Sequence, residues 1–232
     1  MIRLRRSLIL TVCWLNATRL VGQETAVDAS GGFSLALYGE KDRVTVNLRY
    51  ESARKPADSK IAQLTDLTLE LLAPDTELDT IQWRLSSEEC AFDFDRDIAR
   101  SSAPTALASA DGETSVTGVG FEWSKDTASI HLPQHQQSIL ALPENDSTLS
   151  VRAQRFTFHT ASGLAVYEGG VTVHYGVDGD QMSTDRLELQ LDPESSRATE
   201  GRALGAVVLQ SAPGESGLRV AGKEALFDLS VA

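Results

Sequence analysis

Three acidic residues in this sequence have the spacing of a calcium-binding loop. Asp93, Asp95 and Asp97 stand at alternate positions, as the first ligands of an EF-hand do. However, Ile98 occupies the position that needs Gly, and Pro104 occupies the position that needs a bidentate Glu. Without those two residues the loop can neither turn sharply around the ion nor complete its coordination. We therefore interpret the three carboxylates as a solvated face of a strand.

Two histidines and two candidate nucleophiles also form partial patterns. His131 and His135 have the i, i+4 spacing of a zinc-protease pair, but Pro133 lies between them and no Glu follows His131. The segment 214–217, Gly-Glu-Ser-Gly, lacks the pattern of a nucleophile elbow. Cys90 has no neighbour in the sequence that would activate a thiol, so we expect a small buried side chain. The sequence thus predicts no catalytic residue, no metal site and no cofactor, and a protein that is not an enzyme.

The elements that would position any site are strands. Apolar side chains recur at every second position in 155–158, 167–173 and 185–191, which is the period of a half-buried strand. Gly163 and the segment 176–179 supply the turns between them. Upstream, strands are predicted at 33–38, 44–50, 64–72, 81–85, 92–94 and 137–142. The fold class that follows is all-β, with antiparallel strands joined by short turns.

One stretch fits two periods. The leucines of 64–72 have a helical spacing at Leu64, Leu67 and Leu71, and they also alternate as in a strand. Thr68 and the nearby Pro74 favour the strand.

Parts of the chain repeat. The stretch 85–95 resembles 182–192, and a smaller unit recurs because Arg155-Phe156-Thr157-Phe158 resembles Arg186-Leu187-Glu188-Leu189. Repeated strand-turn units bury their apolar faces by stacking on one another. We therefore expect one continuous body over 33–232, with 33–142 and 149–232 as two repeat sets.

The order of parts in the second set is distinctive. An Arg-led strand is followed by a short turn, by Tyr167 before Gly169-Gly170-Val171, and by a polar Thr184-Asp185-Arg186 entry into the next strand. This order resembles the repeat of the OstA-like family of lipopolysaccharide-transport periplasmic proteins, LptA and LptC among them. The resemblance extends over 149–229 and more loosely over 81–132, and it is closer to an LptC-like than to an LptA-like protein. It implies a β-jellyroll, open along one side, that carries the acyl chains of lipopolysaccharide between two sheets toward the outer membrane.

The resemblance also implies a site and partners. The partners would be lipopolysaccharide or a related lipid, together with other Lpt-type jellyroll proteins joined through edge strands such as 225–231, and no nucleic acid. The inward-facing side chains of the second repeat set would line the lipid groove. These are Phe156, Phe158, Val171, Val173, Leu187, Leu189, Val207, Leu209 and Phe227. A closed core would show the same alternation, so the alternative is a non-catalytic structural or adhesive β-repeat protein of the cell envelope.

The N-terminus has the pattern of an export signal. Arg3, Arg5 and Arg6 precede the short apolar run 8–15, which falls below the roughly 20 residues needed to span a bilayer. We expect a signal peptide over 1–22, either cleaved or kept as an anchor, then a flexible lead-in over 23–32, in a periplasmic protein. The full chain has a net charge of −12, and loss of the basic signal makes it more acidic. Such a charge disfavours binding to nucleic acid.

Overall fold

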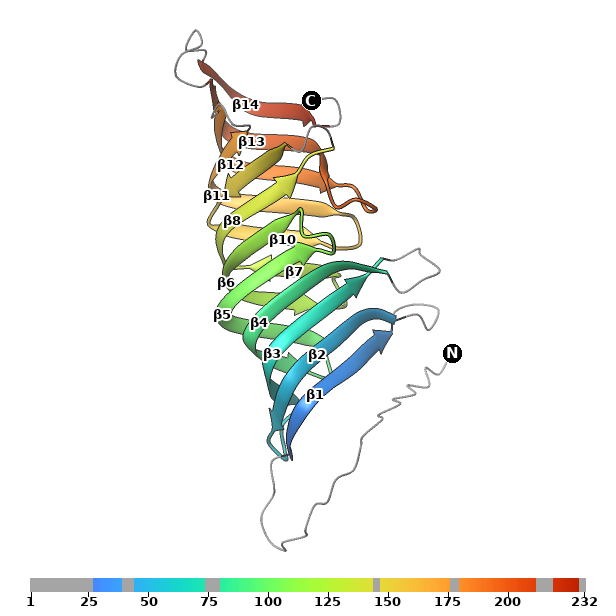
Figure 1. The fold of residues 1–232 in the computed structure, drawn as a ribbon. Helices are drawn as coiled ribbons and strands as arrows, with labels where there is room; N and C mark the ends of the chain where they lie inside the picture. The colour runs from blue at the N-terminus through green and yellow to red at the C-terminus, as the bar shows by residue number, and fades with distance from the viewer. Residues whose placement is uncertain are drawn as a thin grey trace, which may run out of the picture.

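The described part of the chain is one antiparallel β-sheet. The computed structural model describes residues 27–38, 44–73, 80–143, 147–175, 180–211 and 219–229, and within these ranges it contains 14 strands and no helix (Figure 1). The predicted all-β, antiparallel class is confirmed. In chain order the strands are β1 (Val27–Tyr38), β2 (Val44–Lys55), β3 (Ile61–Leu72), β4 (Ile81–Asp93), β5 (Ile98–Ser109), β6 (Ser115–Ser124), β7 (Ser129–Leu132), β8 (Gln134–Ala141), β9 (Thr148–Arg152), β10 (Arg155–His159), β11 (Leu164–Tyr175), β12 (Asp180–Leu191), β13 (Ala198–Gln210) and β14 (Arg219–Asp228).

The sheet divides into two leaves. Strand β6 pairs with β8 through residues 115–119 and with β7 through residues 122–124. Likewise β11 pairs with β10 through its first half and with β9 through its second half. The short strands are therefore halves of two bent strands, β7 with β8 and β9 with β10. We call the leaf that contains β8 and β9 the first leaf and the one that contains β7 and β10 the second leaf; the long strands run through both.

The sheet folds where its strands bulge. Shifts of register fall near the middle of the pairs β4–β5, β5–β6, β11–β12, β12–β13 and β13–β14. In β11 the shift lies at Gly169 and Gly170, whose φ angles of 83° and 62° belong to the left-handed region that glycine adopts without strain. An extra residue in one strand bends it and increases its twist. A row of such bulges turns one sheet into two leaves that face each other.

The bulges also change which residues face the interior. In β3 the buried positions are Ala62 and Leu64 before the bend, and Leu67 and Leu69 after it. Asp66 lies between the two pairs with a φ of 50°, outside the usual strand conformation, and the alternation of buried positions shifts by one there. The helix-like spacing of Leu64 and Leu67 in the sequence is thus the mark of a bent strand.

The interior between the leaves is filled over most of the stack. Trp83 of the first leaf packs edge-on against Phe158 of the second, with ring centroids 4.9 Å apart. Both side chains are buried, as are Phe92, further along β4, and Leu132 of β7, which pairs with β10. Contacts of this kind stabilise the fold by removing apolar surface from water, about 25 cal/mol per Å².

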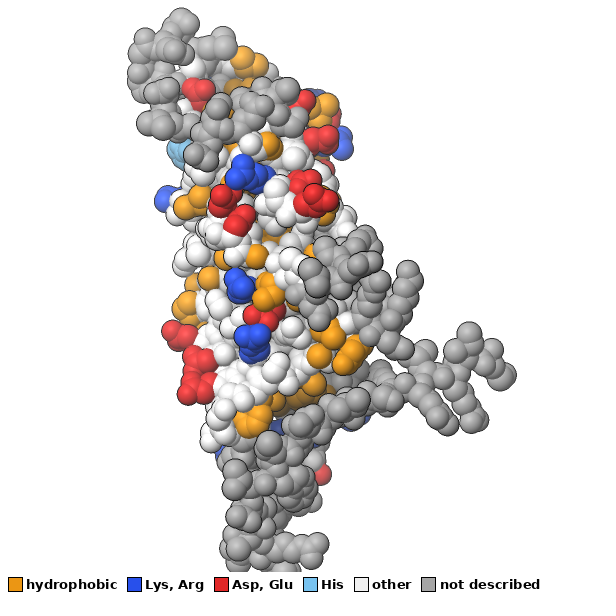
Figure 2. All heavy atoms as spheres, turned by 45° about the vertical axis from the view of Figure 1, so that its right-hand side comes forward, with side chains coloured by type: hydrophobic (Ala, Val, Ile, Leu, Met, Phe, Trp, Pro, Cys, Tyr) orange, Lys and Arg blue, Asp and Glu red, His pale blue; other side chains and the backbone are white. Residues whose placement is uncertain are grey.

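The outer surface of the sheet is charged. On the face shown in Figure 2, Lys and Arg side chains lie beside Asp and Glu side chains. Cross-strand ion pairs of the second leaf include Arg100 with Glu122, at 2.7 Å, and Arg202 with Glu224, at 2.7 Å. Exposed pairs of this kind contribute at most about 1 kcal/mol each, so the outer face adds little to stability compared with the core.

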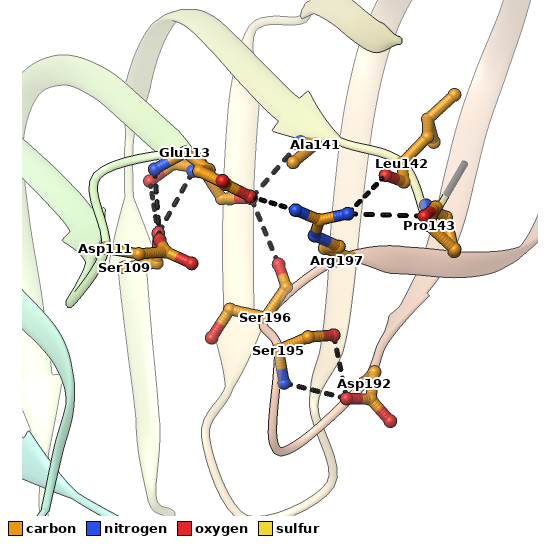
Figure 3. Close-up of polar contacts among 11 residues, drawn as sticks. Ser109, Asp111, Glu113, Ala141, Leu142, Pro143, Asp192, Ser195, Ser196 and Arg197 are labelled. Atoms are coloured by element: carbon orange, nitrogen blue, oxygen red, sulfur yellow. Dashed lines mark hydrogen bonds and ion pairs between the residues drawn. The ribbon is translucent and has the colours of Figure 1, made fainter. Parts of the chain in front are cut away.

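A polar cluster joins the two leaves at their edges (Figure 3). The turn 192–197 follows β12 in the second leaf, and it meets the turn 110–114 and residues 142–143, which lie at the edge of the first leaf. The Arg197 guanidinium donates to the carbonyls of Leu142, at 3.3 Å, and Pro143, at 3.2 Å, and to Glu113 Oε2, at 2.6 Å. We call this cluster the clasp.

The centre of the clasp is buried. The Thr114 hydroxyl donates to the carbonyl of Ser196, at 3.0 Å, and accepts from the N–H of Ala141, at 3.2 Å. Thr114 and Ser196 are both buried. The Thr114 hydroxyl therefore forms one hydrogen bond to a buried backbone group of each leaf.

Several boundaries differ from the sequence analysis. Residues 27–32, assigned to the flexible lead-in, form the first half of β1. Strand β2 continues to Lys55 instead of ending near residue 50. Its second half pairs with the first half of β3 and so forms part of the second leaf. The signal segment 1–22, the turn 176–179, the motif 214–217 and the last residues of the predicted strand 225–231 lie outside the described residues. Within the described ranges, no helix is long and apolar enough to cross a membrane.

Candidate functional site

The interior opens into a groove at the C-terminal end of the stack. It has a volume of about 470 Å³ and is lined by side chains of β9, β11, β12, β13 and β14. The first leaf contributes Leu149, Val173 and Met182, and the second contributes Leu187, Leu189 and Phe227. The walls are therefore apolar on both sides, as in sites that hold hydrocarbon.

The structure divides the nine candidate groove residues between this groove and the filled core. Five of them, Val173, Leu187, Leu189, Leu209 and Phe227, line the groove. The other four do not line it but are buried, with exposed fractions of 2% at Phe156, 1% at Phe158, 0% at Val171 and 3% at Val207. Phe156 and Phe158 lie on β10, which is stacked closer to the middle of the sheet than β12 to β14. The groove is therefore shorter than the second repeat set.

Sequence reasoning missed several of the residues at the groove. They are Leu149, Tyr175, Met182, Val220 and Leu229. Leu149 and Val220 lie near strand ends with few alternating neighbours, which weakens a period-2 signal. Met182 lies on the N-terminal side of the β12 bulge, where the buried positions are shifted by one relative to Leu187 and Leu189.

Gly201 of β13 lies between two residues of the groove wall, Leu189 and Phe227. It is paired in register with Leu189 of β12 on one side and with Phe227 of β14 on the other. A Cβ atom at this position would lie 2.9 Å from Leu189 Cδ2 and 3.2 Å from Phe227 Cδ2. The missing side chain thus lets its two neighbours share the space above β13.

The rim of the groove is polar and contains two carboxylates. Asp180 begins β12, and Asp228 ends β14, on the opposite leaf. Gln181, Gln210 and Ser211 complete the polar part of the lining, and no Lys or Arg is among the described residues of the groove.

The groove is closed on its N-terminal side. Leu140, Leu142 and Val151, at the inner end, are each at most 1% exposed. Beyond them lie the Trp83–Phe158 contact and the clasp. The interior is consequently a pocket open toward β14 and not a passage along the whole stack.

A second polar cluster lies where the leaves separate. His135 Nε2 lies 2.9 Å from Ser138 Oγ, and the Tyr167 hydroxyl donates to the same oxygen at 3.0 Å. His135 Nδ1 accepts the N–H of Ala153, at 3.1 Å, so the ring proton is on Nε2 and points to the serine. Burial lowers the pKa of His135 to about 4 and raises the pKa of Tyr167.

This arrangement cannot activate Ser138 as a nucleophile. A general base must accept the serine proton, whereas His135 in this tautomer donates one. Ser138 is also fully buried, so no substrate reaches it. The cluster holds the two leaves together at the bend.

The other reactive residue types have structural partners. Asp93 Oδ1 accepts the N–H groups of Asp95, at 3.0 Å, and Arg96, at 3.2 Å, which shapes the turn after β4. Asp97 pairs with Lys125 at 3.2 Å. Burial raises the pKa of the Cys90 thiol to about 12, which keeps it protonated and unreactive. In the part of the chain that the structure describes, no three His, Cys, Asp or Glu side chains gather as a metal site would require.

Comparison with known proteins gives no family. Neither protein-family models nor curated protein sequences produced a match to the chain.

Proposed function

We propose that the protein is an exported, non-catalytic lipid carrier that shields an acyl chain between its two leaves. In this proposal it is a periplasmic component of lipopolysaccharide or related lipid transport, similar to LptA and LptC, that passes lipid toward the outer membrane. The observation that carries the proposal is the apolar groove of about 470 Å³ between the leaves.

The lining of the groove is suited to hydrocarbon. Leu189, Met182 and Leu209 offer only apolar atoms, and they come from both sides of the space. Transfer of each methylene group from water into such a site is worth about 0.8 kcal/mol. An acyl chain of about 12 methylenes would gain on the order of 10 kcal/mol before ordering costs, so a lipid can be held without a charged clamp.

The folded sheet supports the finer assignment to an OstA-like jellyroll. Two facing antiparallel leaves with an opening at one end provide the space that the family uses for acyl chains. The order of motifs that carries the resemblance lies in β10 to β12, and β11 and β12 form part of the groove wall.

The ends of the stack are the surfaces proposed for partner proteins. In the described residues, β14 pairs only with β13 and β1 only with β2, so each has one edge without a neighbour in the sheet. An open edge offers backbone groups to a further strand. Pairing of β14 with a second Lpt-type jellyroll would extend the groove across the joint.

Photo-crosslinking in cells tests the lipid proposal. A photoreactive amino acid at Val173 or Leu209, which line the groove, is expected to capture lipid. The matched controls are Thr172 and Val208, the adjacent positions, whose side chains point to the other face of their strands. Equal labelling of both sets, or none of either, would instead support the structural β-repeat protein.

A further inference from the structure

The two ends of the stack differ in how far their inner faces are exposed. Strands β1 and β14 lie at opposite ends of the sheet (Figure 1). On the inner face of β14, Val220 lines the groove and is 47% exposed. On the inner face of β1, Leu37 is 8% exposed, and its partner across the strand pair, Val46, is buried as well. The interior is therefore open at the β14 end and covered at the β1 end.

The β1 end is filled by its own side chains. Phe33 of β1 stacks on Tyr50 of β2, with ring centroids 5.4 Å apart. Farther in, Leu48 of the first leaf and Leu64 of the second leaf belong to one buried cluster. Within the described residues, side chains thus occupy the space between the leaves at this end, and an acyl chain can enter there only by displacing them.

The middle of the stack separates the two ends. The contact between Trp83 and Phe158 crosses from leaf to leaf, and the buried Tyr167 is held by its hydrogen bond to Ser138. At the edges of the leaves, Arg197 joins them through the clasp. A lipid in the groove therefore meets packed rings along the stack and a hydrogen-bonded seam at its side. To pass either barrier it must break buried contacts, whereas exchange through the open end breaks none of them.

We infer that the protein exchanges lipid only through its β14 end, so that loading and delivery use the same opening in succession. This inference rests on the proposed function and specifies its mode. The protein is then a shuttle that holds lipid, and not a segment of a continuous lipid path. The donor and the acceptor of the lipid approach the β14 end in turn, while a partner at the β1 edge binds the protein without receiving lipid.

Selective modification of one thiol at each end tests this inference. Val220→Cys and Tyr38→Cys place a cysteine near the first-leaf end of β14 and of β1, at positions that are 47% and 50% exposed. Both variants also carry Cys13→Ser, and the remaining native thiol, Cys90, is buried with a pKa raised to about 12, so the introduced thiol is the one that reacts. A maleimide that carries a polyethylene glycol chain then obstructs one end of the stack.

Stopped-flow fluorescence of cis-parinaric acid, a fluorescent fatty acid, measures both directions of exchange. Loading is followed after mixing the fatty acid with empty protein, and release after mixing loaded protein with an excess of phosphatidylcholine vesicles. Modification of Val220→Cys should slow both steps at least about tenfold relative to the same variant before modification, because the adduct stands in the proposed route. Modification of Tyr38→Cys should change neither rate.

Two controls accompany the measurement. Circular dichroism before and after modification checks that the strands remain. Leu229→Cys, at the second-leaf side of the same opening, provides an independent attachment point and should give the same result as Val220→Cys.

The outcomes separate this inference from the proposed function. Slower exchange after modification of Tyr38→Cys would reveal a second opening and overturn the inference. So would adducts at Val220→Cys and Leu229→Cys that slow one step alone or neither step. Each of these results leaves the lipid-carrier proposal standing, because lipid is still bound. Failure of the unaltered protein to bind cis-parinaric acid would overturn the proposed function and this inference with it.

Discussion

Leu189 and Phe227 lie on either side of Gly201 and share the space that a side chain at that position would occupy. The three residues are in register across β12, β13 and β14. Their arrangement makes Gly201 the position at which the groove can be filled without altering the apolar residues that form its walls.

Filling this position should block binding. In Gly201→Val the added methyl groups must displace Leu189 Cδ2, which lies 2.9 Å from the site of the new Cβ atom. The flexible end of a leucine can move, so we expect the fold to persist with a loss of about 1–3 kcal/mol. Displacement of the neutral probe N-phenyl-1-naphthylamine by monolaurin should show that the affinity for monolaurin falls at least tenfold. Circular dichroism checks that the strands remain, and unchanged affinity in a folded variant would exclude this part of the groove as the binding site.

The clasp should contribute measurably to stability. In Thr114→Val the hydroxyl is replaced by a methyl group, which leaves the Ser196 carbonyl and the Ala141 N–H without that partner in a buried place. We expect the free energy of unfolding to fall by about 1–3 kcal/mol. The matched control is Thr117→Val, whose exposed hydroxyl donates to the Gln137 carbonyl at 3.2 Å. Urea titration compares the two, and equal losses would contradict a special role for the clasp.

Burial of His135 should make stability depend on pH. Its pKa is lowered from 6.5 to about 4 in the folded protein, so between these values the unfolded chain binds a proton that the folded protein does not. The stability that neutral His135 provides is complete above pH 6.5 and decreases as the pH falls toward 4, by about 3 kcal/mol in total. In His135→Gln this part of the pH dependence should disappear, while His174→Gln, at an exposed position, should retain it. Identical pH profiles for His135→Gln and the unaltered protein would show that His135 is not buried as described.

The open edge of β14 gives a prediction about association. The N–H of Leu229 donates to the Thr199 carbonyl of β13, at 2.8 Å. Because N–H groups of an antiparallel strand point alternately to its two sides, those of Leu226 and Asp228 point to the open edge. Leu226→Pro should therefore weaken pairing of this edge with the proposed partner protein without breaking a bond to β13, whereas Leu226→Ala keeps the N–H group and serves as control. Sedimentation velocity of mixtures with that partner measures the association. If Leu226→Pro associates as well as Leu226→Ala, this edge is not the joint.

The sequence predicted the strands better than their bends. Alternation of Leu187, Leu189 and Leu191 indicated the buried face of β12, because all three residues follow the bulge at 183–186. The bends themselves were not predicted, because at a residue such as Asp66 the pattern of buried positions shifts by one and the strand looks partly helical. Bending depends on how neighbouring strands pair, which a single stretch of sequence does not contain.

For the candidate groove, the sequence predicted which residues face the interior but not where that interior is filled. An alternating apolar residue faces the interior whether that interior is filled or empty, so Phe158 and Leu189 have equivalent patterns. The structure distinguishes them because Trp83, 75 positions before Phe158, packs on its ring. Gly201 carried no apolar signal, although it is in register with two groove residues.

Nuclear magnetic resonance of the methionine methyl groups tests the central claim most directly. The chain has two methionines, Met1 and Met182, and Met182 lines the groove. In protein labelled with carbon-13 at these methyl groups, we predict a saturable shift of the Met182 signal as monolaurin is added, and no such shift in folded Gly201→Val. A Met182 signal that stays unchanged up to the solubility limit of the lipid would contradict the binding of an acyl chain between the two leaves.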